Sequence, residues 1–181
     1  TAVITENGKP AIQWNGVDNY VDNYLITGDI TYSSSYGQDF AVGSVLGDND
    51  DGILNMWGVE GGPNLMMNMR TVPTKAVRTR RGSLLLTSSN NVFTSNTQHI
   101  FNTENNPSNT AVFYVDGTSV LSGAGGAVTG TSKAVIGTAF STFGDPLAGK
   151  LQEVIIYNQY DSNYRTGIET NIDDYYQIPG I

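Results

Sequence analysis

Residues 111–121 read AVFYVDGTSVL, and this stretch predicts a β-hairpin. Two runs rich in β-branched and aromatic residues flank the pair Asp116 and Gly117. Asp-Gly readily adopts the positive φ angles of a type I′ turn, whose twist matches that of the flanking strands. We therefore expect two antiparallel strands here. The glycine-rich residues 122–127 that follow predict a loop.

The same pattern extends outward from this hairpin in both directions. Short apolar stretches recur at roughly ten-residue spacing, separated by Gly, Asn, Asp and Ser, which is typical of a sandwich or barrel. The predicted strands are 11–14, 24–31, 40–46, 53–59, 65–70, 83–87, 98–101, 111–115, 119–121, 134–136 and 149–158. One helix is expected near the end, where Thr166 and Glu169 have capping-box spacing and Ile168, Ile172 and Tyr175 share a face.

Length and composition favour one folded domain, although the chain can equally be a segment of a longer protein. The 181 residues contain 39% hydrophobic and only 14% charged residues, so Asn, Ser, Thr and Gly must supply much of the polar surface. The net charge of −8 argues against nucleic acid as a partner. No apolar run is long enough for membrane insertion, and the absence of cysteine excludes disulfide and thiol chemistry.

Three ordered segments resemble the concanavalin A-like, laminin G-like β-sandwich family. Residues 12–21 resemble its opening strand and turn, with Asn15 and Asn19 in place of acids. Residues 97–102 and 112–117 are similar to its paired central strands, and 149–158 to its closing strand. Residues 165–172, with Tyr175 and Tyr176, look most like modules of bacteriophage structural and bacterial surface proteins.

The resemblance implies an all-β fold, a two-sheet antiparallel jelly-roll sandwich over residues 1–181 with a short C-terminal helix. It also implies an attachment module on a virion or an extracellular cell surface. The partner would be a glycan or a structural protein of the same particle, and homo-oligomerisation stays open. A calcium-dependent lectin-like module is the alternative, and an atypical glycosidase is a remote third.

An enzyme is not expected. Glucanases of this fold place paired carboxylates on one strand, and no such Glu-x-Asp segment occurs here. Glu153 has no acidic partner two to five residues away on its predicted strand. His99 is the single histidine, and we expect it to be a hydrogen-bonded sheet residue.

Candidate ligand-binding residues are aromatic side chains near predicted loops. Trp57, Tyr32 and Tyr36 offer ring faces for stacking on sugars, and Asn49 offers hydrogen bonds. The competing interpretation is that Trp57 is buried by the alternation of its strand.

A Ca²⁺ ion is the cofactor that the sequence allows. Asp48, Asp50 and Asp51 cluster in a predicted loop and offer oxygen ligands, although the run does not match the EF-hand template. The competing interpretation is a solvated acidic turn.

A basic segment gathers more than half of the positive charge of the chain. Its members are Arg70, Lys75, Arg78, Arg80 and Arg81. They predict either a patch that docks an anionic partner or an edge strand protected by charge against aggregation.

Overall fold

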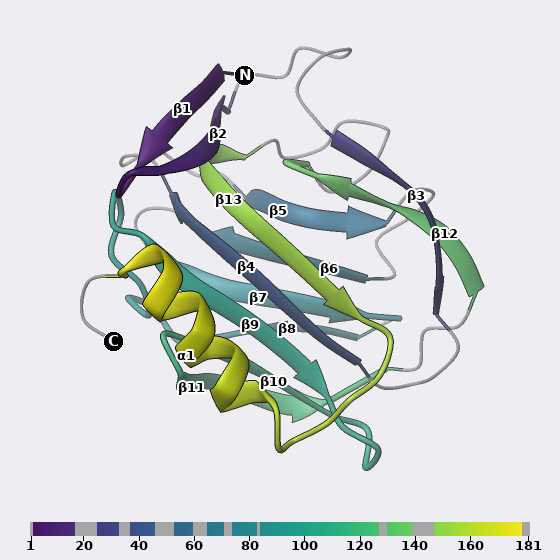
Figure 1. Cartoon of the computed structure of the whole chain (residues 1–181). Helices are drawn as coiled ribbons and strands as arrows, with labels where there is room; N and C mark the ends of the chain where they lie inside the picture. Colours follow the sequence, from purple (N-terminus) through teal and green to yellow (C-terminus); the bar gives the residue numbers. More distant parts are fainter. Residues whose placement is uncertain are drawn as a thin grey trace.

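Two antiparallel β-sheets packed face to face form the protein, with one helix outside them (Figure 1). The computed structural model describes residues 2–16, 25–32, 37–45, 53–59, 65–70, 74–82, 84–126, 130–138 and 147–178. The predicted fold class, a jelly-roll β-sandwich with a short C-terminal helix, is confirmed. No helix in these ranges combines the length and the apolar character needed to cross a membrane.

The first sheet has seven strands in the order β1-β2-β13-β4-β9-β10-β11. Their bounds are β1 Ala2–Glu6, β2 Lys9–Asn15, β4 Gly37–Val45, β9 His99–Asn105, β10 Thr110–Val115, β11 Thr118–Ala124 and β13 Ala148–Tyr157. The second sheet has the order β3-β12-β5-β6-β7-β8. Its bounds are β3 Leu25–Tyr32, β5 Ile53–Val59, β6 Leu65–Arg70, β7 Ala76–Arg81, β8 Leu84–Thr87 and β12 Gly130–Ile136.

The predicted hairpin is present as β10 and β11. Asp116 has a φ of 50° and Gly117 a φ of 74°, the positive values that the type I′ turn requires. β11 continues to Ala124, into the stretch that we predicted to be a loop. Glycine is tolerated there because β11 is the last strand of its sheet and pairs only with β10.

The main core lies between the sheets. It contains Trp14, Phe101 and Phe113, with Met67 and Met69 from the opposite sheet, all at most 1% exposed. A buried ion pair also joins the sheets, with Arg81 Nη2 3.0 Å from Asp39 Oδ2, and the Thr103 hydroxyl donates to the same oxygen at 2.9 Å. Burial raises the pKa of Asp39 to about 6, while Arg81 and the Thr103 hydroxyl act to lower it.

A second, smaller core lies under the helix α1 (Arg165–Tyr176), on the outer face of the seven-stranded sheet (Figure 1). Phe40, Val42 and Ile100 of the sheet contact Ile172 and Tyr176 of the helix. The predicted apolar face is therefore confirmed for Ile172, with Ile168 packed against this core. Tyr176 replaces Tyr175, which is 54% exposed.

The predicted capping box is wrong. The helix begins at Arg165, Tyr164 occupies the cap position, and no side chain caps the helix. Arg165 Nη1 instead lies 2.5 Å from Glu169 Oε2, so the Glu169 carboxylate bonds within the helix and does not reach back to the cap. This i, i+4 ion pair stabilises the first turn of the helix, which the predicted cap would also have stabilised.

Candidate functional site

A β-bulge in β13 decides which side chains of that strand face the helix. The pairing register of β13 with β4 shifts between Leu151 and Glu153. Leu151 lies in the central core before the bulge, and Val154 and Ile156 pack against that core after it. Because side chains alternate along a strand, the outward-facing residues beyond the bulge are Glu153, Ile155 and Tyr157.

A short turn then leads the chain from β13 to α1. The Asp161 side chain accepts a hydrogen bond from the Asn163 N–H at 2.9 Å, and the Asp161 carbonyl accepts one from the Tyr164 N–H at 3.3 Å. The Tyr164 carbonyl accepts the first helical bond, from the Ile168 N–H, at 2.9 Å. The turn therefore fixes Tyr160 and Tyr164 at the start of the helix.

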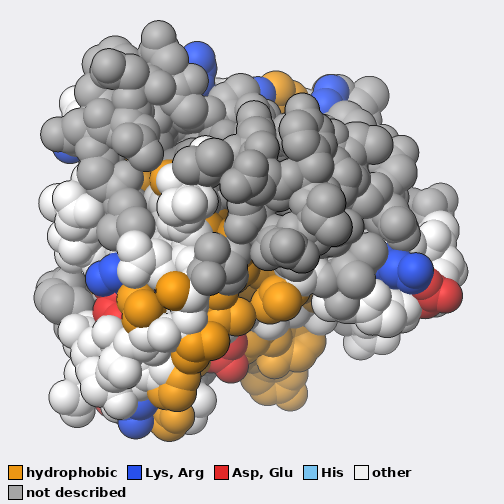
Figure 2. Space-filling view, turned by 90° about the horizontal axis from the view of Figure 1, so that it is seen from above, with side chains coloured by type: hydrophobic (Ala, Val, Ile, Leu, Met, Phe, Trp, Pro, Cys, Tyr) orange, Lys and Arg blue, Asp and Glu red, His pale blue; other side chains and the backbone are white. Residues whose placement is uncertain are grey.

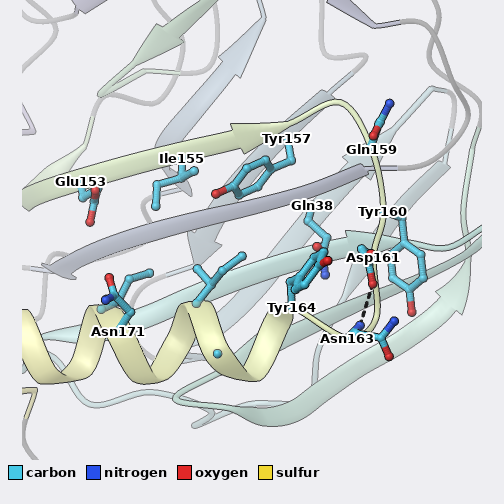
Figure 3. Close-up of a pocket in the computed structure, with 13 residues that line it drawn as sticks. Gln38, Glu153, Ile155, Tyr157, Gln159, Tyr160, Asp161, Asn163, Tyr164 and Asn171 are labelled. Carbon is cyan, nitrogen blue, oxygen red and sulfur yellow. Dashed lines mark hydrogen bonds between the residues drawn. The ribbon is translucent and has the colours of Figure 1, made fainter.

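Strand β13, the turn and α1 enclose a groove of about 610 Å³ (Figure 3). This volume is within the range of small-molecule sites, about 300–1,000 Å³. Its lining residues are Gln38, Glu153, Ile155, Tyr157, Gln159, Tyr160, Asp161, Asn163, Tyr164, Gly167, Ile168, Asn171 and Ile172. We call this space the α1–β13 groove.

Tyrosine rings and amides share the α1–β13 groove. Tyr157 is 44% exposed and Tyr164 64% exposed, so both present ring surface to solvent. Asn163, near Tyr164, and Asn171, toward the Glu153 end, are exposed in the groove and offer donors and acceptors (Figure 3). The isoleucines 155, 168 and 172 provide the apolar part of the lining. The groove can thus accept a ligand with both apolar faces and hydroxyl groups.

A network of polar side chains holds the helical wall of the groove against the sheet. Glu104 accepts hydrogen bonds from Gln38 Nε2 at 3.1 Å and from the Tyr114 hydroxyl at 2.8 Å. The guanidinium of Arg165 lies 4.1 Å from the centre of the Tyr114 ring and also pairs with Glu169. Burial raises the pKa of Glu169, while Arg165 acts to lower it. Gln38 therefore connects the groove lining to the residues that seat α1.

The two carboxylates of the groove lie at its opposite ends (Figure 3). Glu153 is four residues before Tyr157 along the strand, a distance of about 13 Å at the usual strand rise. Asp161 follows Tyr157 in the chain, and its carboxylate accepts a hydrogen bond within its own turn. Glu153 is hydrogen-bonded to Tyr176, whose pKa burial and Glu153 raise to about 12. The pair does not have the close facing arrangement of a glycosidase acid and nucleophile.

The structure does not describe the side chains of the predicted ligand-binding and metal-binding residues. Tyr32 ends β3 and Trp57 is in β5, but their side chains are not among the described ones. Tyr36, Asn49 and the three aspartates at 48, 50 and 51 lie outside the described residues. Within the described ranges, no group of three His, Asp or Glu residues is arranged to hold a metal ion.

The predicted basic patch loses Arg81, and for its other four residues it stays a prediction. Arg81 points into the core and pairs with Asp39, so it cannot meet an external partner. Arg70 is exposed on β6, and Lys75 precedes β7, which carries Arg78 and Arg80. The edge-strand interpretation is wrong, because β6 and β7 each have neighbours on both sides. The one face that Figure 2 shows carries Lys and Arg side chains at several separate places.

His99 is a hydrogen-bonded sheet residue. Its Nδ1 lies 2.6 Å from Asp116 Oδ2, and the Thr94 N–H donates to Nε2 at 3.1 Å. Asp116 also accepts a bond from the Ile100 N–H at 2.9 Å. The ring is 6% exposed and joins the predicted hairpin to the preceding loop, which is a structural role.

Sequence reasoning missed the tyrosines of the groove. Residues 157–164 read YNQYDSNY, and this density of aromatic and amide side chains is a signal for sugar contact. We used residues 149–158 only as a closing strand, and the three rings belong to a strand end, a turn and a helix start. Only the packing of α1 on the sheet brings them together.

No protein-family model matches the sequence, and no curated protein matches it. Solved structures resemble the fold. The CBM40 module of Ruminococcus gnavus IT-sialidase bound to α2,3-sialyllactose is 11% identical with a TM-score of 0.58, and the match covers 81% of this chain and 97% of that one. The heptameric SAP-like pentraxin of Limulus polyphemus is 10% identical with a TM-score of 0.62, covering 90% and 82%.

A third similar structure is the enzymatically active domain of tailspike protein 2 from bacteriophage CBA120. It is 12% identical with a TM-score of 0.68, and the match covers 92% of this chain but only 28% of the tailspike chain. At such low identities these likenesses show the fold alone: the chain has a jelly-roll β-sandwich fold that it shares with these three proteins.

Proposed function

We propose that this domain is a non-catalytic glycan-binding module that attaches a phage particle or a bacterial surface protein to its target. The glycan lies in the α1–β13 groove. The observation that carries the proposal is the grouping of Tyr157, Tyr160 and Tyr164 with Asn163 and Asn171 around one open groove. Aromatic faces stack on the apolar faces of sugar rings, and amides bond their hydroxyls.

Two further points support this proposal. The separated carboxylates Glu153 and Asp161 favour binding over hydrolysis. A module of the same fold was solved with α2,3-sialyllactose bound. A structural protein of the same particle is the competing partner, because the groove also suits a peptide segment.

A glycan array followed by titration calorimetry tests the proposal. Tyr164→Ala removes an exposed ring from the groove, and we expect affinity to fall roughly 10- to 100-fold, as for other aromatic contacts. Tyr175→Ala is the matched control, because Tyr175 is an exposed tyrosine of the same helix that does not line the groove. An array without hits, together with co-assembly of the domain with a particle protein, would replace the glycan by a protein partner.

A further inference from the structure

The charge of the α1–β13 groove is one-sided. Its 13 lining residues include the two carboxylates Glu153 and Asp161, and none of them is Lys or Arg. Asp161 lies beside Tyr160 and Tyr164, and Glu153 lies toward the other end of the groove (Figure 3). A ligand in this groove therefore meets negative charge at both ends and no countercharge from the lining.

The cations that contact α1 are engaged away from the groove. Arg165 lies over the Tyr114 ring and pairs with Glu169. Lys9 Nζ lies 3.8 Å from the centre of the Tyr175 ring, which is outside the groove. Neither side chain lines the groove, so neither offers a carboxylate or sulfate group a partner there.

We infer that the ligand of the groove is a neutral oligosaccharide, one without carboxylate or sulfate groups. The inference rests on the proposed glycan binding. Carboxylates accept hydrogen bonds from sugar hydroxyls, whereas an acidic sugar at either end would face a like charge, with a large cost where water is displaced. The net charge of −8 also slows the approach of acidic glycans.

The length of the groove favours an oligosaccharide over a single sugar. Glu153 and Tyr157 alone are about 13 Å apart along the strand, and the turn extends the lining further. Aromatic surface at Tyr157 and Tyr164 belongs to opposite sides of the groove (Figure 3). A chain of sugars can contact both sides at once, which a monosaccharide cannot do as fully.

Matched glycan pairs test the inference on the full 181-residue chain. Each neutral oligosaccharide is titrated beside its sialylated counterpart, with lactose and 3′-sialyllactose among the pairs. We expect neutral members to bind and their acidic counterparts to bind at least about tenfold more weakly at low salt. Affinity should fall roughly 10- to 100-fold in Tyr164→Ala and stay unchanged in Tyr175→Ala.

A charge-neutral variant identifies the cause of this selectivity. Glu153→Gln combined with Asp161→Asn keeps oxygen acceptors for the Tyr176 hydroxyl and the Asn163 N–H, so the fold should persist. The difference between neutral and acidic members should shrink in this variant, and a circular dichroism melt checks its folding.

The outcomes separate this inference from the proposed function. Acidic members that bind as tightly as neutral ones, with binding weakened in Tyr164→Ala, overturn the neutral ligand but leave glycan binding intact. An unchanged selectivity in the double variant also overturns the electrostatic argument. Failure of every glycan to bind in a Tyr164-dependent way overturns the proposed function itself.

Discussion

Asp39 and Arg81 form an ion pair whose energetic importance depends on pH. In the intact protein, Asp39 retains its proton up to a pKa of about 6, whereas the unfolded chain releases it near 3.8. The folded state therefore holds the extra proton between these values. The contribution of Asp39 to the free energy of unfolding is full below about pH 4, falls as pH rises through about 6, and then levels off.

Arg81→Ala should cost roughly 3 to 5 kcal/mol at pH 8, because an unpaired carboxylate stays buried between the sheets. The loss should be smaller at pH 4.5, where Asp39 is protonated in both proteins. Urea unfolding at the two pH values measures this difference. Arg70→Ala, at an exposed position, should stay within about 0.5 kcal/mol. Equal losses of unfolding free energy at both pH values would show that Arg81 does not pair with a charged Asp39.

Asp116 combines a backbone role with two side-chain contacts. Asp116→Ala loses the contacts to His99 and the Ile100 N–H and places alanine at a positive φ, so we expect a loss of about 2 to 4 kcal/mol. Asp116→Asn tolerates that φ and keeps an acceptor oxygen, so its loss should be about half as large. Chemical denaturation of both variants measures the two losses, and a larger loss for Asn would disprove this explanation.

At the scale of the element, α1 contains one residue, Gly167, that makes a helix less stable than alanine would. Gly167 lies within the helix, and apart from its chain neighbours and the backbone of the helix itself no atom lies within 4 Å of where a Cβ would stand. Gly167→Ala should therefore raise the free energy of unfolding by about 0.5 to 1 kcal/mol. A higher urea midpoint with an unchanged slope would confirm it, and a lower midpoint would show hidden strain. Because it has no side chain, Gly167 leaves space in the groove on the side of the helix.

Strands were predictable where their residues alternate in polarity or have high β-propensity. Residues 53–59 and 65–70 were predicted with the bounds that β5 and β6 have. β7 was missed because its inward-facing side chains include Thr79 and Arg81, and only the Asp39 carboxylate of the other sheet makes a buried arginine there stable. β1 was also missed, since its residues are largely exposed and depend on pairing with β2.

At the scale of the whole molecule, ligand binding should stabilise the entire fold, because the groove joins the sheet to the helix. At a free glycan concentration a hundredfold above Kd, linkage predicts about 2.7 kcal/mol, or an increase in Tm of roughly 5 to 10 °C. Thermal unfolding with and without glycan measures it. Gly167→Leu should fold normally and show no shift, because its side chain fills the groove. A shift of equal size in that variant would place the ligand elsewhere.

The sandwich was predictable from sequence, but the groove was not. Turn residues such as Asp116 and Gly117 act locally, so their effect is visible in the chain itself. Tyr157 and Tyr164 line the same groove only because α1 covers one particular face of one of the two sheets. That choice is made by contacts between distant residues, such as Arg165 with Tyr114.

The bulge between Leu151 and Glu153 has an evolutionary consequence. The extra residue of the bulge, Gln152, decides which face each later side chain takes: if the same sequence paired regularly after Leu151, Glu153 and Tyr157 would turn into the core. Substitutions at Glu153 and Tyr157 can alter what the groove accepts without touching the central core, whereas deleting one residue after the bulge would disrupt the groove and the core together. Lineages of this domain should therefore vary in side chains at 153 and 157 while keeping the number of residues after the bulge constant.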